Sequence, residues 1–357
     1  MAVSLKNIAT ILFVCSILVP FASARRHKDD HGRSKLHVGF YDIPCPQAEK
    51  IVEEVVAEAV SGDNTVPAGL IRLFFHDCFV NGCDASILLE TTPSGEQTEK
   101  DSSANGRTLH GLEVIHKAKA RIEEVCPSIV SCADILAYAA RDSVMHAGLP
   151  YYSVVAGRRD GLISRATDIK GNLPSPNATV SEAFSIFEKK GMTLEEMVVL
   201  TGAHSIGVSH CSTIASRLHN NSASHGRVSA MDASYAGYLK SKCPAGMSPE
   251  DMSQAIVPFD RNNQFKLDNG YYQQLERREG LLHFDQAMVD DDGARPIVRR
   301  MAKQPKTWST KFVKAMQHLG KIDVLTGIMG EIRYDCRAVN FESYNSLQWL
   351  KVPPAQT

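Results

Sequence analysis

The stretch RLFFHDCFVNGCDAS, residues 72–86, contains a basic residue, three phenylalanines, a histidine, two acids and two cysteines. Three kinds of site would use such a set: a His/Cys metal site, a thiol nucleophile with a histidine base, or a disulfide beside a catalytic histidine. The choice among them depends on the oxidation state of the cysteines and on what the rest of the chain provides.

The same stretch has the spacing of an α-helix, because Leu70, Ile71 and Phe74 recur three and four residues apart. Arg72 and His76 are four residues apart, so they project from one face of this helix, one turn from each other. A hydrogen-bonded pair in the protein core is the plain explanation for such residues, and a catalytic pair is the alternative. A motif this short does not decide between them.

Residues 1–24, MAVSLKNIATILFVCSILVPFASA, have the pattern of a secretory signal peptide, with one early lysine, an apolar run and a final Ala-Ser-Ala. No other stretch is long and apolar enough to cross a bilayer, so we expect a soluble secreted protein. Removing the signal takes away Lys6 and no acid, which changes the net charge from −1 to −2. Neither value favours a nucleic-acid partner.

The cysteine count agrees with an oxidising compartment. Of nine cysteines, Cys15 lies in the expected signal peptide, which leaves eight in the mature chain. An even number in a secreted protein predicts disulfides, although the count does not say which cysteines pair. A zinc site would need paired or clustered ligands, and the spacing here is irregular. Oxidised Cys78 and Cys83 could not act as thiolate nucleophiles.

The remaining chain of about 330 residues has no linker or repeat, which predicts one large domain or two closely joined ones. The polar arm at 25–35, RRHKDDHGRSK, is typical of a solvated, disordered terminus, and binding to an acidic polysaccharide is the alternative. We expect the folded domain over 36–340 and a tail over 341–357. Sequons at Asn177 and Asn220 predict glycosylated surface loops.

Helical periodicity dominates the chain. Apolar residues three and four apart, with charges on the other face, predict helices over 48–60, 111–125, 132–144 and 309–319. Thr193 and Glu196 form a capping box, which predicts the start of another helix. Strand-like alternation is scarce, so the predicted fold class is mainly α.

Seven segments, in order, resemble the signature segments of the secretory plant haem peroxidases, class III of the plant peroxidase superfamily. They are LIRLFFHDCFVNGCDASILL, TEKDSSANGRTLHGLEVI, VSCADILAYAARDSV, GRRDG, NLPSP, LTGAHSIGVSHC and EIRYDCRAVN. The similarity extends from about residue 36 to residue 340. It implies the plant haem-peroxidase fold, in which distal and proximal helical halves enclose haem b (iron protoporphyrin IX), and it implies two calcium ions.

The resemblance implies roles on both sides of the haem. His204, in LTGAHS, resembles the proximal iron ligand, and Asp285, in LLHFDQ, resembles the carboxylate that accepts a hydrogen bond from its other ring nitrogen. His76 resembles the distal acid–base group for hydrogen peroxide, and Arg72 the cation that stabilises the negative charge that develops. Three further residues would complete the pocket: Asn105 accepting a hydrogen bond from His76, Glu99 in the network behind it, and Phe75 packed over the haem.

The resemblance also implies two calcium sites made of oxygen ligands, which suit a hard cation. The first set is Asp77, Val80, Gly82, Asp84 and Ser86. The second set is Ser205, Asp260, Asn263, Lys266 and Asp268. In the second set a serine and an asparagine stand where threonine is common in the family. Both side chains still offer an oxygen ligand, so we expect the second calcium site to be kept. The property that these two substitutions could change is its affinity for calcium.

Four disulfides follow from the same resemblance: Cys45–Cys126, Cys78–Cys83, Cys132–Cys336 and Cys211–Cys243. The short loop closed by Cys78 and Cys83 would hold calcium ligands beside His76. Asp134 and Arg158 resemble a structural salt bridge, which would explain an acid in the otherwise apolar segment CADIL.

Pro174, in NLPSP, resembles a residue at the mouth of the haem channel whose carbonyl contacts aromatic reductants. Ser103 and Asn177 stand nearby, at positions where some relatives carry aromatic residues. We therefore expect a haem edge that is more polar or partly shielded by glycan. His110 and His116 stand where the family more often has arginine and aspartate, and we expect them to alter only surface charge.

The resemblance implies a secreted haem peroxidase that reduces hydrogen peroxide and oxidises small phenolic donors, such as cell-wall phenolics and lignin precursors, by one-electron steps. We expect a monomer without a nucleic-acid partner or membrane span, at most in weak contact with acidic wall polysaccharide. The apoplast or cell wall is the expected location, ahead of the vacuole. The alternative is a non-catalytic wall-binding protein of the same fold. The joint presence of the catalytic set favours the enzyme: Arg72, His76, Asn105, His204 and Asp285.

Overall fold

The computed structural model describes residues 36–219 and 231–340. The predicted signal peptide, the polar arm, the sequon at Asn220 and the C-terminal tail therefore lie outside the described residues. Within the described segments, no helix combines the length and apolar character needed to cross a membrane.

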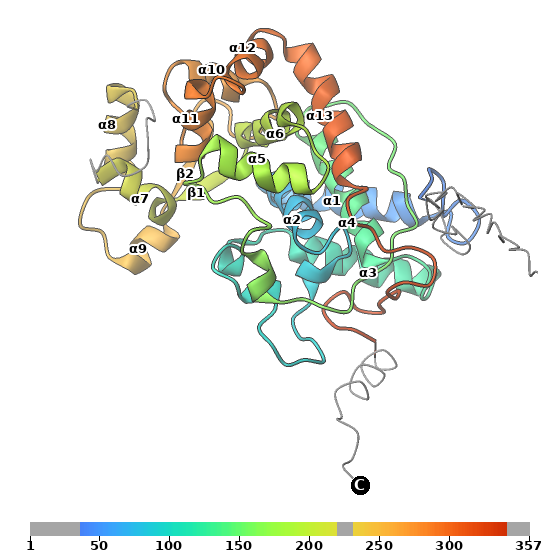
Figure 1. The fold of residues 1–357 in the computed structure, drawn as a ribbon. Helices are drawn as coiled ribbons and strands as arrows, with labels where there is room; N and C mark the ends of the chain where they lie inside the picture. The colour runs from blue at the N-terminus through green and yellow to red at the C-terminus, as the bar shows by residue number, and fades with distance from the viewer. Residues whose placement is uncertain (1–35, 220–230, 341–357) are drawn as a thin grey trace, which may run out of the picture. The chain divides into compact units, whose positions relative to one another are not determined.

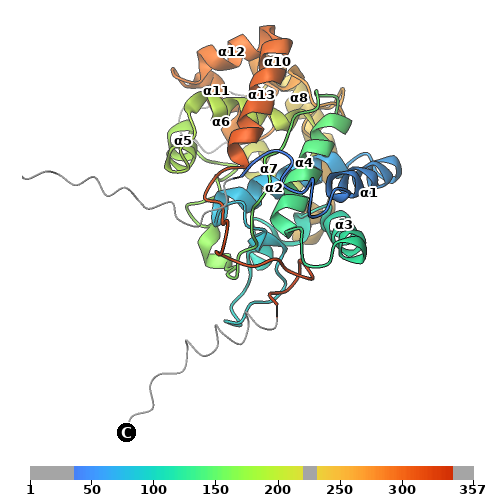
Figure 2. The same cartoon turned by 90° about the vertical axis from the view of Figure 1, so that its right-hand side faces the viewer.

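The first half of the domain is built around four helices. They are α1 (Ala48–Gly62), α2 (Val66–Val80), α3 (Leu112–Val125) and α4 (Cys132–His146). Three short 3-10 turns lie between α2 and α3: η1 (Ser86–Leu88), η2 (Glu99–Asp101) and η3 (Gly106–Thr108). A fourth, η4 (Ala166–Ile169), follows α4. Helix α4 packs against α1, α2 and α3, and Figure 2 shows α1, α3 and α4 together on one side. The helices predicted from periodicity in this half are confirmed.

The second half contains more helices, and all of them except the last, α13, are shorter than those of the first half. They are α5 (Val180–Lys189), α6 (Leu194–Thr201), η5 (Gly202–Ser205), α7 (Cys211–His219), α8 (Ala233–Lys242), α9 (Pro249–Gln254), α10 (Gly270–Glu276), α11 (His283–Asp290), α12 (Arg295–Lys303) and α13 (Pro305–Leu319). Helix α13 begins four residues before the predicted start. The Thr193 hydroxyl accepts a hydrogen bond from Glu196 N at 3.2 Å, so the predicted capping box is confirmed.

The described residues contain little β-structure. Strands β1 (Val208–His210) and β2 (Ile256–Pro258) form an antiparallel pair with His210 opposite Ile256. Figure 1 shows α7, α8 and α9 gathered beside this pair, and a separate apolar cluster that includes Ile214, Tyr235 and Leu239 lies under it. The mainly α fold class is therefore confirmed.

Helix α2 is the central element of the first half, and its sequence explains its position. Leu70, Leu73 and Phe79 are fully buried, because apolar residues occupy nearly every side of this helix. A helix that is apolar on all sides must be covered on all sides. Pro67 lies in the first turn, where its missing N–H costs no hydrogen bond. The exception is the side that carries Arg72, Phe75 and His76, which is only partly covered by protein.

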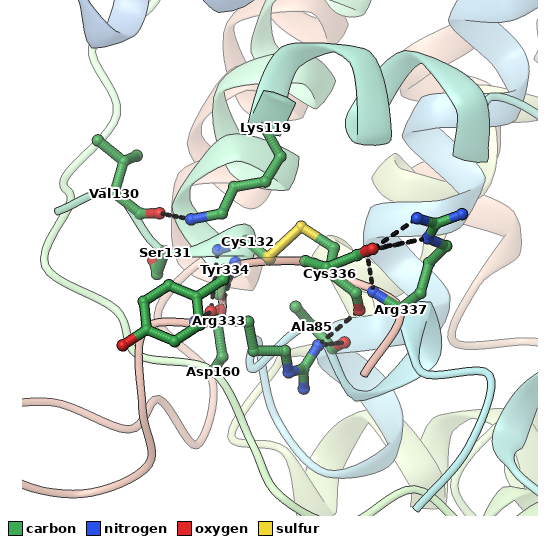
Figure 3. The surroundings of a disulfide bond; sticks show 12 residues. Ala85, Lys119, Val130, Ser131, Cys132, Asp160, Arg333, Tyr334, Cys336 and Arg337 are labelled. Atoms are coloured by element: carbon green, nitrogen blue, oxygen red, sulfur yellow. Dashed lines mark hydrogen bonds and ion pairs between the residues drawn. A yellow bond between two sulfur atoms is a disulfide. The ribbon is translucent and has the colours of Figure 1, made fainter. Parts of the chain in front are cut away.

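All four predicted disulfides are present: Cys45–Cys126, Cys78–Cys83, Cys132–Cys336 and Cys211–Cys243. The Cys132–Cys336 bond joins residues 204 positions apart, and Figure 3 shows Arg333 beside it. The Arg333 guanidinium donates to the carbonyl oxygens of Ala85 at 2.8 Å and Cys336 at 3.1 Å. The C-terminal segment is thereby tied both to α4 and to the loop after α2.

A buried ion pair joins the start of α4 to the loop that follows it. Arg158 Nη1 lies 2.7 Å from Asp134 Oδ1, and both side chains are almost fully buried. The second carboxylate oxygen, Oδ2, accepts hydrogen bonds from Tyr41 Oη at 2.8 Å and Gly157 N at 2.7 Å. The predicted structural salt bridge is confirmed, and its charges are balanced and hydrogen-bonded as burial requires.

We predict that Asp134→Asn lowers the free energy of unfolding by about 3–5 kcal/mol, because it leaves Arg158 charged, buried and unpaired. The control is Glu54→Gln, which removes the exposed ion pair to Arg121 and should cost less than about 1 kcal/mol. Urea unfolding of the two variants measures both values. Equal losses would contradict this account of the buried pair.

Candidate active site

His76, the predicted distal residue, is anchored through one ring nitrogen. His76 Nδ1 lies 2.6 Å from Asn105 Oδ1, and Asn105 Nδ2 donates to the main-chain carbonyl of Glu99 at 2.8 Å. Because the amide N–H group is used on Glu99, its oxygen faces the imidazole, so Nδ1 carries the proton. His76 Nε2 makes no hydrogen bond within the described part of the chain. The lone pair of this nitrogen is therefore available as a base.

The pocket keeps His76 neutral. Burial lowers the pKa of its imidazole to about 3, and the nearby positive charge of Arg72 acts in the same direction. Burial also lowers the pKa of Arg72 to about 10, so its guanidinium remains charged at neutral pH. A neutral base and a fixed cation thus occupy one face of α2, one turn apart.

The loop that contains Asn105 and binds His76 also binds the Arg72 side chain. The guanidinium donates from Nη1 to Thr108 O at 2.8 Å and from Nη2 to Ala104 O at 2.9 Å. Both acceptors are main-chain carbonyls on either side of Asn105. The predicted Arg–His pair is therefore positioned by a single loop, from Ala104 to Thr108.

Glu99 belongs to the same network through its backbone. Its Oε1 atom accepts a hydrogen bond from Asn81 Nδ2 at 2.9 Å, whereas Oε2 is buried without a hydrogen bond. Burial raises the pKa of Glu99 to about 8, and the charge of Asp84 adds to the increase. The Glu99 side chain thus faces the region of the predicted first calcium site.

His204, the predicted proximal residue, is also anchored through Nδ1. His204 Nδ1 lies 2.9 Å from Asp285 Oδ1, and the Asp285 carboxylate is fully buried. Asp285 Oδ2 accepts a hydrogen bond from Leu282 N at 2.9 Å, at the start of α11. His204 Nε2 makes no hydrogen bond in the described segments, and 30% of its side chain is exposed. This nitrogen is free to bind a metal.

Two aromatic residues that the sequence did not single out surround His204. The Phe259 ring stacks on the imidazole with ring centroids 4.2 Å apart, and the Tyr271 ring meets it edge-on at 6.0 Å. The Tyr271 hydroxyl donates to Asp285 Oδ1 at 2.9 Å. The only sequence feature that could have pointed to these two aromatic residues is that they lie close to the predicted calcium ligands Asp260 and Asp268.

The proximal loop and the distal helix meet at a glycine. A methyl group on Gly207 would lie 2.9 Å from Ala68 Cβ, and its φ of +81° also favours glycine. Ala68, Arg72 and His76 follow one another at four-residue intervals, so they share one face of α2. The helix face that carries the Arg–His pair is thus the face that approaches the loop after His204.

Phe75 lies between this face and an aromatic cluster. Its ring is 4.3 Å from that of Phe79 and 5.9 Å from that of Phe187 on α5, measured between centroids. Phe75 is partly exposed, while Phe79 and Phe187 are buried. Phe79 and Phe187 hold one side of the Phe75 ring in place, and the exposed part of the ring is accessible to a ligand.

The predicted first calcium site is a buried group of oxygen atoms. Asp77 and Asp84 are buried, and the Ser86 hydroxyl is buried without a hydrogen bond. Burial raises the pKa of Asp77 well above its usual range, with the charge of Asp84 adding to it, and raises that of Asp84 to about 6. A divalent cation would balance these carboxylates. The carbonyl of Val80 also accepts a hydrogen bond from Lys190 Nζ at 3.2 Å.

The predicted second set converges in the same half as His204. Added to Gly270, a Cβ atom would lie 2.9 Å from Asp268 Oδ1 and 3.2 Å from Asp260 Oδ2. The Ser205 hydroxyl accepts a hydrogen bond from Asp268 N at 3.1 Å. Lys266 donates its N–H to the Asn263 carbonyl at 3.2 Å. In the described residues no group of three or more His, Cys, Asp or Glu side chains could hold a metal, so carbonyl and hydroxyl oxygens would have to contribute.

The predicted substrate edge is accessible. Ser103 and Asn177 are exposed, and Pro174 is half-buried. Phe284 N, on α11, donates to the Pro176 carbonyl at 3.0 Å. The segment that carries Pro174 is thereby held to the helix that carries Asp285.

The prediction that His110 affects only surface charge is wrong. His110 Nε2 lies 3.0 Å from Thr65 Oγ1 and 3.4 Å from Asp63 Oδ2, at the turn before α2. His116 is half-buried, and its Nε2 atom has no hydrogen bond. The expectation came from comparing these two positions with the family pattern, which does not show what lies across from them in the fold.

These features define the class of protein. Two imidazoles, each anchored through Nδ1 with Nε2 free, lie on a helix and a loop that approach each other within a mainly α fold. One imidazole lies beside a fixed cation and the other beside a buried carboxylate. This donor set suits a haem, with an iron ligand on one side and a proton-transfer group on the other.

Comparisons with known proteins agree with this class. The peroxidase family model matches residues 52–304. The chain is 45% identical over 307 residues to peroxidase 5 of Vitis vinifera, covering 86% of this chain and 92% of the relative. It is 41% identical over 317 residues to peroxidase 1 of Zea mays, covering 88% and 86% of the two chains. The chain therefore belongs to the peroxidase family, in its class III plant branch.

Membership establishes the general activity and the cofactors. The protein is a haem peroxidase that uses hydrogen peroxide to oxidise donor molecules, and it binds haem and two calcium ions. The free Nε2 atoms of His76 and His204 suit haem, and the unpaired buried oxygens near Asp84 suit calcium.

We predict that prolonged chelation with EGTA destabilises the folded protein by about 3–4 kcal/mol, the value for loss of a ligand held at several hundred times its Kd. Asp84→Asn should reduce the bound calcium from two ions per chain to one, measured by atomic emission. Asp292→Asn is the control, because that carboxylate is 98% exposed. Full calcium content in the Asp84 variant would contradict its assignment.

Proposed function

We propose that this enzyme is a secreted peroxidase that oxidises small phenols. One hydrogen peroxide would accept two electrons and two protons from two phenol molecules, giving two water molecules and two phenoxyl radicals. The observation that carries the proposal is the pair of histidines, each held through Nδ1 by an acceptor and each with a free Nε2. Cell-wall phenolics and lignin precursors are the donors we propose, with peroxide removal during oxidative stress as the accompanying effect.

His204 would bind the haem iron through Nε2, and Asp285 would hold its imidazole in one tautomer. Haem, when bound, supplies the iron centre that exchanges electrons with peroxide and donor. The buried Asp285 carboxylate draws the Nδ1 proton of His204, which makes the imidazole a stronger electron donor. Phe75 would pack against the opposite haem face and limit what reaches the iron.

His76, Arg72 and Asn105 would carry out the proton chemistry. His76 Nε2 takes a proton from one oxygen of hydrogen peroxide and delivers it to the other, so that water leaves. Its low pKa keeps it unprotonated and ready to accept that proton. Arg72 stabilises the negative charge that develops as the oxygen–oxygen bond breaks. Asn105, oriented by the Glu99 carbonyl, keeps the base function on Nε2.

Two oxygen-ligand sets would hold the calcium ions. We assign the first ion to side chains of Asp77, Asp84 and Ser86 with carbonyls of Asp77, Val80 and Gly82, and the second to Ser205, Asp260, Asn263, Lys266 and Asp268. The first lies directly after His76 in α2, so its occupancy would stabilise the helix end that carries the base. The Cys78–Cys83 bond closes the same loop.

The exposed edge near Pro174 would receive the phenol. The carbonyl of Pro174 is the proposed acceptor for the phenolic hydroxyl. Ser103 and Asn177 make this edge polar, and a glycan on Asn177 would cover part of it. We therefore propose a preference for small phenols over bulky ones.

The proposed organisation of the chain is a signal peptide over 1–24, a polar arm over 25–35, the peroxidase domain over 36–340 and a tail over 341–357. We propose a monomeric enzyme of the apoplast or cell wall, glycosylated at Asn177 and Asn220. The polar arm has the charge for a weak contact with acidic wall polysaccharide.

The absorption spectrum of the purified mature protein tests the function. We expect a Soret band that shifts on addition of hydrogen peroxide and returns on addition of a phenol such as guaiacol. A colourless protein that takes up no haem but binds wall polysaccharide would support the non-catalytic alternative instead.

Variants at the two histidines separate haem binding from chemistry. His204→Ala should lose most of its haem, measured by the Soret absorbance per polypeptide. His76→Leu should keep its haem and react with peroxide about 10²–10⁴-fold more slowly, because the proton-transfer group is removed. Stopped-flow mixing measures the rate. A His76→Leu protein as fast as the wild type would refute the acid–base role.

Glycosylation at Asn177 should change the preference among phenols. Asn177→Gln removes the sequon while keeping an amide side chain, so the rate ratio of bulky to small phenols should rise. Enzymatic deglycosylation of the wild type should raise it equally. Steady-state oxidation of a small and a bulky phenol measures the ratio, and an unchanged ratio in both preparations would contradict shielding by the glycan.

A further inference from the structure

The Asp285 carboxylate accepts more than the hydrogen bond from His204. Its Oδ1 atom is 2.9 Å from His204 Nδ1 and also 2.9 Å from the Tyr271 hydroxyl, while Oδ2 accepts from Leu282 N at 2.9 Å. Tyr271 and Asp285 are both buried. Two donors therefore share the same buried carboxylate oxygen.

Filling the core does not by itself require the Tyr271 hydroxyl to contact Asp285. The next residue, Tyr272, is equally buried, but its hydroxyl donates to the carbonyls of Val198 at 2.9 Å and Val199 at 3.1 Å. Both tyrosines thus fill core space and both satisfy their hydroxyls, as buried polar groups must. Only the Tyr271 hydroxyl reaches the acceptor of the proximal histidine.

Sharing an acceptor has an electrostatic consequence. Each hydrogen bond to a carboxylate neutralises part of its charge, and the effect is large where the dielectric is low. The bond from Tyr271 therefore weakens the pull of Asp285 on the Nδ1 proton of His204. An imidazole that holds its own proton more firmly donates less electron density through Nε2.

We propose that Tyr271 is a positioning residue that tunes the haem iron through Asp285 and His204, and that its hydroxyl raises the Fe(III)/Fe(II) reduction potential. The inference rests on the proposed role of His204 as the iron ligand. Tyr271 does not touch the iron. It orients the Asp285 carboxylate from α10 while His204 approaches from η5, and it limits how much charge Asp285 passes on.

The test compares Tyr271→Phe with Tyr272→Phe in the holoenzyme. Tyr271→Phe should lower the Fe(III)/Fe(II) midpoint potential and raise the iron–histidine stretching frequency of the ferrous protein in resonance Raman spectra. Tyr272→Phe loses an equally buried hydroxyl from a different network and should leave both values unchanged. Replacing Tyr271 with 3-fluorotyrosine strengthens the donor at nearly constant size, so it should shift both values in the opposite direction.

Unchanged values in both Tyr271 proteins would overturn the inference, and so would equal shifts in Tyr271→Phe and Tyr272→Phe. If Tyr271→Phe does not retain haem, the 3-fluorotyrosine protein decides by the direction of its shift. A wild-type protein that binds haem and reacts with peroxide, combined with unresponsive Tyr271 variants, would refute this inference alone. A wild type without haem bound to His204 would refute it together with the proposed function.

Discussion

The buried carboxylate of Asp285 is the group on which the proximal half of the protein depends. A carboxylate without water is stable only if hydrogen bonds and nearby positive charge replace its hydration. Three elements supply the hydrogen bonds: His204 from η5, Tyr271 from α10 and the main chain of Leu282 at the start of α11. The positive charge that acts on this carboxylate is that of Arg217 on α7. Satisfying one anion thus holds three separate segments together and leaves His204 Nε2 directed away from them. The hydrogen bonds that stabilise the buried Asp285 carboxylate are therefore the same ones that orient the His204 imidazole.

Three other polar sites show how burial is balanced, or left unbalanced, elsewhere in the protein. Asp134 is balanced by Arg158 and by neutral donors, so its site is complete without a ligand. His76 is neutral, and one amide oxygen from Asn105 is sufficient to orient it. Asp77 and Asp84 are buried close together with too little positive charge, as their raised pKa values indicate. A divalent cation at this position would balance both carboxylates and would couple ion binding to the helix that carries His76.

Much of the fold could be predicted from local pattern. The amphipathic helices and the capping box at Thr193 depend on residues within a few positions of each other, so the sequence contains their causes. An even cysteine count predicted disulfides, but their pairing came from resemblance, because it depends on which helices meet. His110 shows the limit: its partners Thr65 and Asp63 lie 45 and 47 positions away, and no local pattern predicts such a contact.

The sequence by itself determined the helical class, the one-turn spacing of Arg72 and His76, and, through its motifs, the family. Those properties follow from short-range periodicity and from residues that stand in a recognisable order. Only the tertiary structure decided that the Glu99 carbonyl orients the Asn105 amide, that Gly207 lets the loop after His204 approach α2, and that Tyr271 rather than Tyr272 reaches Asp285. Adjacent tyrosines are alike in sequence, and only packing in three dimensions decides which hydroxyl meets which acceptor.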